Sequence, residues 1–171
     1  EEIGEIKNSD INNVWIIDPI DGTTNFLHGV PHFAISIALK SNNEIISGLI
    51  FDPIKDEMFF AEKNSGAFLN NQRIKVSKKK NINTCLFATG GKDKSSVDLT
   101  TRKSGSAALD MAYVAAGRYD GYFQSNLNIW DIAAGIVIVK ESGGIVSEID
   151  LIKNDYIDIK AASSAINEKM L

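Results

Sequence analysis

The stretch from Val14 to Phe26 most constrains what this chain can form, because it joins an apolar run directly to two carboxylates, a glycine and two threonines. Val14 to Ile17 contains only β-branched and aromatic residues, which predicts a short strand buried on both faces. Pro19 has no N–H to donate, so we expect it to end the hydrogen-bonded ladder and to hold Asp18 in an extended conformation. The stretch therefore predicts a strand that carries polar side chains at its end.

The two acids at this strand end are spaced to meet. Asp18 and Asp21 are separated by a proline turn, so their carboxylates and the Ile20 carbonyl can converge on one point. Buried carboxylates repel each other unless a cation lies between them or one of them takes up a proton. Oxygen ligands without a nearby thiol or imidazole pair favour Mg²⁺, Mn²⁺ or Ca²⁺ over Zn²⁺. The spacing therefore indicates a site for a hard divalent cation.

Gly22, Thr23 and Thr24 follow the acids and are suited to begin a helix. The free N–H groups and the positive dipole end of that helix would point to the same place as the metal, which is a way in which proteins bind phosphate. The alternative is purely structural. A strand, an Asx-type turn and a helix cap use Asp, Gly and Thr for local reasons.

Two motifs stand out in the chain. The first is the run from Trp15 to Phe26, and the second is Trp130 to Gly135 followed by Glu141-Ser142-Gly143-Gly144. Together they resemble the signatures of the inositol monophosphatase family of Mg²⁺-dependent, lithium-sensitive sugar phosphatases. Two long motifs in the family's order are far more specific than a single glycine pattern. The resemblance implies an α/β fold, an α+β layered sandwich of mostly antiparallel sheet and helices, formed by residues 1–171 as a single domain.

The resemblance also implies roles for individual residues. The metal ligands would be four acids and one carbonyl, holding two or three Mg²⁺ ions or possible Mn²⁺ substitutes: Glu1, Asp18, Asp21, Asp131 and the Ile20 carbonyl. Catalysis would involve Asp18, with Thr23 and Glu1 orienting the attacking water. Substrate binding would use backbone and side-chain groups from both motifs and the helix between them: Gly22, Thr23, Gly105, Ser106, Ala107, Gln124 and Asp131.

Some of these residues also have a structural interpretation. Ser106 precedes a predicted helix over 107–116, where a serine serves equally well as an N-cap. Asp131 lies at or near the start of a second predicted helix, where aspartate is favoured whatever the function. Gln124 stands where the family commonly has a glutamate that binds a hydroxyl of the inositol ring. A neutral amide can still bind a polyol, so preference for inositol does not follow.

The rest of the chain predicts a sheet-rich fold. Alternating patterns and turn residues indicate an antiparallel meander over 33–39, 44–52, 57–61, 66–69 and 73–76, then strands at 84–89, 122–124, 144–148 and 159–163. Such a meander needs helices on at least one face. A terminal helix to Leu171 is expected to follow the last strand. The polar stretch 90–98 is expected to be a loop where the family has a longer segment.

Composition excludes several classes of function. A net charge of −4 gives no reason to expect nucleic-acid binding, and the single Cys85 excludes an internal disulfide. We see no apolar run of membrane-spanning length and no signal peptide, so a cytoplasmic protein without a membrane partner is expected. The chain begins at Glu1 without a methionine. We therefore expect a fragment that lacks the helices preceding this point in the family, whose members are often homodimers.

Metal-dependent hydrolysis of a small-molecule phosphate monoester is the function these features favour, and inositol 1-phosphate is the substrate that the resemblance suggests first. Phosphatases that act on fructose 1,6-bisphosphate, histidinol phosphate or adenosine 3',5'-bisphosphate carry the same two signatures and remain alternatives. A different class of alternative is a non-catalytic relative kept as a binding or regulatory module. Dependence of phosphate release on Mg²⁺ separates these classes.

Overall fold

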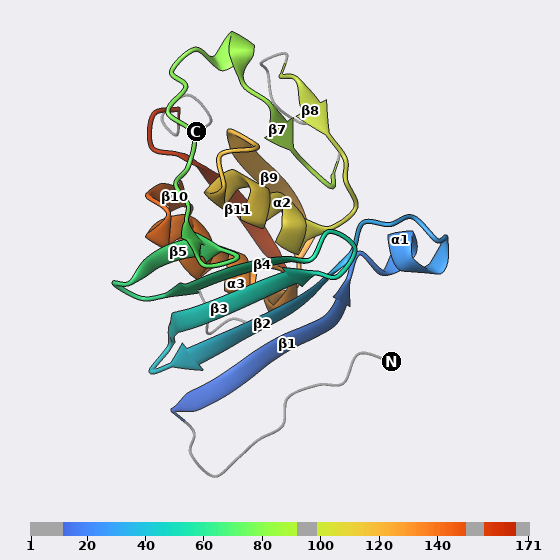
Figure 1. Ribbon diagram of the computed structural model, residues 1–171, viewed down its shortest axis with the longest axis vertical. Helices are drawn as coiled ribbons and strands as arrows, with labels where there is room; N and C mark the ends of the chain where they lie inside the picture. The colour runs from blue at the N-terminus through green and yellow to red at the C-terminus, as the bar shows by residue number, and fades with distance from the viewer. Residues whose placement is uncertain (1–11, 92–98, 150–155, 167–171) are drawn as a thin grey trace.

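Two β-sheets enclose a layer of two helices in the computed structural model, which describes residues 12–91, 99–149 and 156–166 (Figure 1). Helix α3 (Ile129–Glu141) contacts strands of both sheets, and helix α2 (Ala107–Ala115) packs beside it. A third, short helix, α1 (Thr23–Leu27), lies outside this layer at one end of the first sheet. This architecture confirms the α/β class expected from the sequence.

The first sheet is an antiparallel meander in chain order, as predicted, but the strand expected over 73–76 is shorter and lies at 72–73. Its strands are β1 (Asn13–Asp21), β2 (Ala34–Ser41), β3 (Glu44–Asp52), β4 (Glu57–Glu62), β5 (Gly66–Leu69) and β6 (Gln72–Arg73). The β2–β3 turn contains Asn42 and Asn43, with φ of 48° and 64°. Tight hairpins need positive φ at both central residues, and asparagine tolerates that conformation. The same residue pair closes the β5–β6 hairpin at 70 and 71.

Two expectations for β1 are wrong. The strand is not buried on both faces, because it is the first strand in the sheet order and leaves Trp15 60% and Ile17 50% exposed. Pro19 does not end the ladder either. The pairing with β2 shifts between Asp18 and Asp21 and then resumes at Asp21, opposite Ala34. Within the described residues β1 has one neighbouring strand, β2, and a strand in that position tolerates a proline at such an irregularity.

The second sheet has the strand order β10 (Gly144–Val146), β11 (Ile157–Ser163), β9 (Gly121–Leu127), β7 (Phe87–Ala88) and β8 (Thr101–Arg102). Strand β7 runs parallel to β8 and β9, and the other pairs are antiparallel. The strand predicted over 84–89 is shorter than expected because a 3₁₀ turn, Ile82–Thr84, capped by the Asn81 side chain, precedes it. The end of the predicted terminal helix lies outside the described residues.

The central helices are buried all round rather than on one face. All nine residues of α2 are buried, as are eight residues of α3. Small side chains allow this close packing: a Cβ added to Gly48 of β3 would lie 2.7 Å from the Ala134 carbonyl of α3. Helix α3 is therefore closely packed on β3, and it also contacts β1. Among the described residues, no helix has the length and apolarity needed to cross a membrane.

Candidate metal centre

Three aspartates from distant parts of the chain meet at the end of β1, where its pairing with β2 is irregular. Asp18 and Asp21 come from the irregular end of that strand, and Asp131 comes from the first turn of α3. One carboxylate oxygen from each lies within 4.8 Å of the others. Asp18 and Asp21 are only 7% and 6% exposed. Carboxylates this close and this buried need protons or a cation, and their hard oxygen atoms fit Mg²⁺ or Mn²⁺.

Each of these carboxylates is oriented by the backbone. One oxygen in each accepts a hydrogen bond from a main-chain N–H: Ile20 N to Asp18 (3.0 Å), Ala108 N to Asp21 (3.0 Å) and Asn128 N to Asp131 (2.8 Å). Donors of this kind fix the direction of a carboxylate before a ligand arrives, and metal sites depend on them nearly as much as on the ligands. The arrangement is therefore ordered enough to bind a cation.

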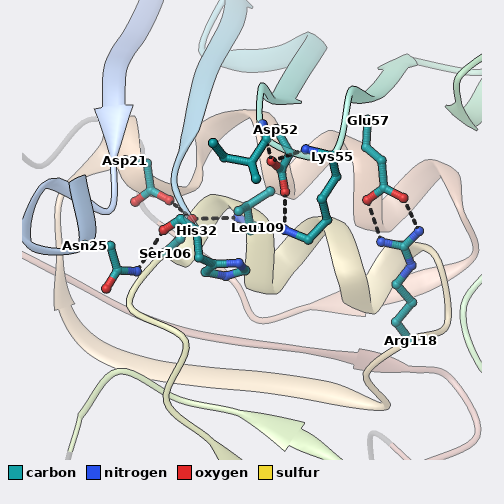
Figure 2. Close-up of polar contacts among 10 residues, drawn as sticks. Asp21, Asn25, His32, Asp52, Lys55, Glu57, Ser106, Leu109 and Arg118 are labelled. Carbon is teal, nitrogen blue, oxygen red and sulfur yellow. Dashed lines mark hydrogen bonds and ion pairs between the residues drawn. The ribbon is translucent and has the colours of Figure 1, made fainter. Parts of the chain in front are cut away.

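Ser106 joins the acid cluster to helix α2. Its hydroxyl donates to Asp21 and also accepts from Leu109 N at 3.2 Å, which caps the helix (Figure 2). Burial raises the pKa of Asp21 from 3.8 to about 7, against the hydrogen bond from Ser106, and the neighbouring Asp18 charge raises it further. Burial makes the charged form of this carboxyl group unfavourable, so the group tends to keep its proton. A bound cation would stabilise the charged form strongly.

Ser106 and Asp131 also have the helix-capping roles that the sequence left open as alternatives. Ser106 is the N-cap of α2, and the Asp131 side chain forms a capping box with Asn128 at the start of α3. Capping uses one oxygen of the Asp131 carboxylate, while the same side chain lies in the acid cluster. Cap and cluster coexist because the first turn of α3 faces the end of β1.

The turn after Asp21 places the next predicted residues beside α2. Gly22, the N-cap of α1, has φ of 90°, and a Cβ built there would lie 3.2 Å from the Gly105 carbonyl. The Thr23 hydroxyl donates to the Ile20 carbonyl at 3.2 Å. Ala107 begins α2. The structure thus brings the predicted phosphate-binding turn against the segment predicted to contact substrate hydroxyls.

Glu1 and Gln124 are the remaining predicted site residues. Glu1 lies outside the described residues. Gln124, on β9, accepts a hydrogen bond from the Tyr122 hydroxyl at 2.9 Å. Burial raises the pKa of Tyr122 well above its usual value, and the charges of Asp110, Asp21 and Asp131 act in the same direction. Gln124 is therefore hydrogen-bonded to a tyrosine whose pKa is raised in part by the charges of nearby aspartates.

Sequence reasoning missed Asp110, which lies in the first turn of α2 and is 2% exposed. Its Oδ1 has no hydrogen-bond partner within the part of the chain that the structure describes. Burial raises its pKa from 3.8 to about 7, against a hydrogen bond with the Ser104 side chain, and the charge of Asp21 raises it further. An acid in a helix's first turn is usually solvated, so only the burial of the whole helix distinguishes this one.

We expect the Asp110→Asn variant to gain stability over the parent protein at pH 8 and to gain little at pH 4. The folded state holds the Asp110 proton up to about pH 7, whereas an unfolded aspartate loses it near pH 3.8, so the parent loses stability as the pH rises between these values. The gain at pH 8 should be on the order of 2 to 4 kcal/mol.

Urea unfolding of the metal-free protein at both pH values measures this difference. Asp56→Asn is the matched control, since Asp56 is exposed and its φ of 52° suits asparagine. Equal changes in unfolding free energy at pH 4 and pH 8 would contradict the assignment of a buried, proton-holding carboxyl at Asp110.

Comparisons with known proteins agree with this architecture. A family model described as the inositol monophosphatase family matches residues 1–171. The inositol-1-monophosphatase of Rhizobium meliloti (strain 1021) is 45% identical over 159 residues, covering 84% of this chain and 60% of that protein. The Nus factor SuhB of Escherichia coli (strain K12) is 42% identical over 163 residues, covering 86% of this chain and 61% of that protein. This chain therefore spans less than two thirds of either relative.

A solved structure shows the same arrangement of elements. The extragenic suppressor protein suhB from Bartonella henselae, in its native crystal structure, is 43% identical and superposes with a TM-score of 0.91. The match covers 99% of this chain and 72% of that one. The resemblance carried by the two sequence motifs is confirmed at the level of the whole chain, which belongs to the inositol monophosphatase family.

Proposed function

We propose that this protein hydrolyses phosphate monoesters with the help of Mg²⁺ held by Asp18, Asp21 and Asp131. The observation that carries the proposal is the convergence of three carboxylates, two of them almost fully buried, on one place. A buried cluster of this charge is costly without a cation. Family membership supports the reaction class, since relatives at this level of identity are named inositol-1-monophosphatase.

When bound, the two or three ions would lower the pKa of a water molecule and neutralise negative charge on the leaving oxygen. Residues of the chain would orient the water and the phosphate group. Thr23, whose hydroxyl lies 3.2 Å from the Ile20 carbonyl, would orient the attacking water together with Glu1. The amides of Gly22 and Thr23 would hold the phosphate oxygens for in-line displacement. The Ile20 carbonyl would join the three aspartates and Glu1 as a ligand.

The substrate would extend from the phosphate toward the start of α2 and β9. Gly105 and Ala107 would contact its hydroxyls there, with Asp131 and Gln124 on the other side. The single hydroxyl proton of Ser106 is already donated to Asp21, so Ser106 would act on the substrate as an acceptor or through its backbone. These contacts suit a small polyol phosphate, and inositol 1-phosphate is the specific substrate that we propose.

Gln124→Glu should lower KM for inositol 1-phosphate about tenfold and leave kcat nearly unchanged, because a charged acceptor binds a hydroxyl more strongly than an amide does. The Tyr122 hydroxyl donates to Oε1 at 2.9 Å, and a carboxylate can accept the same bond, so the fold should tolerate the change. Steady-state kinetics measure both constants. Hydrolysis of p-nitrophenyl phosphate, which lacks the polyol, is the control and should not change. An unchanged KM for inositol 1-phosphate would exclude Gln124 from the substrate site.

The proposal is tested by phosphate release from a panel containing inositol 1-phosphate, fructose 1,6-bisphosphate, histidinol phosphate and adenosine 3',5'-bisphosphate, with Mg²⁺ or with EDTA. We expect release that requires Mg²⁺ and is fastest with inositol 1-phosphate. A faster rate with another member would reassign the substrate. No release from any of them would favour a non-catalytic binding protein.

We also propose, from the resemblance, that Li⁺ inhibits the reaction and that the protein is a homodimer. The hard oxygen ligands support a further proposal, that Mn²⁺ can replace Mg²⁺. A cytoplasmic location is proposed as well. Inhibition by Li⁺ can be measured in the same assay. Sedimentation equilibrium measures the oligomeric state. Full activity in the presence of Li⁺ would argue for a different type of phosphatase.

A further inference from the structure

We propose that Asn25 is a positioning residue that holds the Gly22–Thr23 turn against the start of helix α2. This inference rests on the proposed function, which assigns that turn to the phosphate group and the start of α2 to the rest of the substrate. Asn25 itself lies one turn beyond Gly22 and belongs to neither group. Its contribution would be to fix the distance between them.

Helix α1 is too short and too exposed to be stable without contacts to other parts of the chain. It has five residues, none of them buried, and isolated helices of this length are unstable in water. Asn25 is half-buried, while the other four side chains of the helix are exposed. Phe26 packs edge-on against Phe33, which follows in the same loop. Contacts to a distant part of the chain must therefore place the helix.

Asn25 makes such a contact through its side-chain amide. Its Nδ2 donates to the Ser104 carbonyl at 2.9 Å, across 79 positions in the sequence, and to the His32 carbonyl at 2.8 Å. The amide has two N–H groups, so the two bonds use its full donor capacity and fix the plane of the side chain. Figure 2 shows Asn25 beside Ser106 and His32, on the same side of the view as Asp21.

The backbone around this amide is packed too closely to move independently. A Cβ added to Gly105 would lie 2.8 Å from the Asn25 Nδ2, and one added to Gly22 would lie 3.2 Å from both the Gly105 and the His32 carbonyls. Gly22 and Gly105 also have φ of 90° and 88°. Glycine at both positions lets the two segments approach each other, and the Asn25 amide then bonds them together.

A second link between β1 and α2 is independent of Asn25. Asp21 accepts from the Ala108 N–H at 3.0 Å and from the Ser106 hydroxyl, so the metal-ligand end of β1 is bound to α2 directly. Loss of the Asn25 amide should leave this link in place. The predicted defect is therefore specific: the metal should still bind, while the phosphate-holding turn is displaced.

The test compares Asn25→Ala and Asn25→Asp with the unsubstituted protein. We expect kcat for inositol 1-phosphate to fall about 10- to 100-fold in both variants, since small displacements of positioning groups have effects of this size. Inhibition by inorganic phosphate should weaken about tenfold, by loss of aligned donors. The Kd for Mn²⁺, measured by electron paramagnetic resonance, should stay within about twofold, because the ligand set is unchanged.

Asn81→Ala is the matched control, because Asn81 also bonds the backbone through its side chain, at the 3₁₀ turn before β7. Turnover by Asn25→Ala within twofold of the parent would overturn the inference. Equal losses of Mn²⁺ affinity and of turnover, or unfolding of both Asn25 variants while Asn81→Ala folds, would also overturn it by showing a purely structural role. Failure of the unsubstituted protein to release phosphate would instead overturn the proposed function.

Discussion

Asp18→Asn should lower Mg²⁺-dependent phosphate release about a thousandfold while the protein remains folded. Metal ions in such sites contribute several kcal/mol to transition-state stabilisation, and removal of one of three clustered charges should remove most of that contribution. Asparagine has the shape of aspartate, and its Oδ1 can still accept the hydrogen bond that Ile20 N donates at 3.0 Å. The turn should therefore keep its conformation.

Initial rates with inositol 1-phosphate and circular dichroism of the same sample measure turnover and folding together. Asp56→Asn removes an exposed carboxylate that does not belong to the acid cluster and should leave the rate unchanged. Turnover by Asp18→Asn that matched the control would place the chemistry elsewhere in the molecule.

Mg²⁺ should raise the melting temperature of the protein, and more so at pH 8 than at pH 5. A ligand at one hundred times its Kd stabilises the folded state by about 2.7 kcal/mol, which for a chain of this size corresponds to roughly 5 to 10 °C. In the metal-free fold the pKa of Asp21 is raised to about 7, so a proton occupies this carboxyl at pH 5 and competes with the cation. Above pH 7 the cation instead relieves the repulsion among the three charges.

Thermal unfolding with Mg²⁺ and with EDTA at both pH values measures the shift. Asp131→Asn should lose most of it, because that carboxylate belongs to the cluster as well as to the cap of α3. A melting temperature insensitive to Mg²⁺ at pH 8 would mean that the cluster does not bind the ion in the folded protein.

Local spacing predicted the part of the site that lies within one turn of chain. Asp18 and Asp21 follow a strand and are separated by a proline turn, so sequence alone indicates that they can meet. Asp131 is more than one hundred positions away, and only the family resemblance associated it with the pair. The fold explains the meeting, because the first turn of α3 packs against the end of β1 in the layered core.

What sequence reasoning missed depends on packing between distant elements. The apolar run of β1 gives no sign that the strand lies at an edge, since the number of neighbouring strands is a property of the whole sheet. Burial of Asp110 follows from enclosure of α2 between two sheets, which one helix's periodicity cannot reveal. The bond from Asn25 to the Ser104 carbonyl likewise has no local signal, because its acceptor is a backbone group 79 positions away.

Anomalous X-ray diffraction from crystals grown with Mn²⁺ locates the cation without reference to any activity. We expect an anomalous peak at ligand distance from one carboxylate oxygen of each of Asp18, Asp21 and Asp131. Anomalous peaks only at other sites, with these three carboxylates unliganded at saturating Mn²⁺, would contradict this expectation.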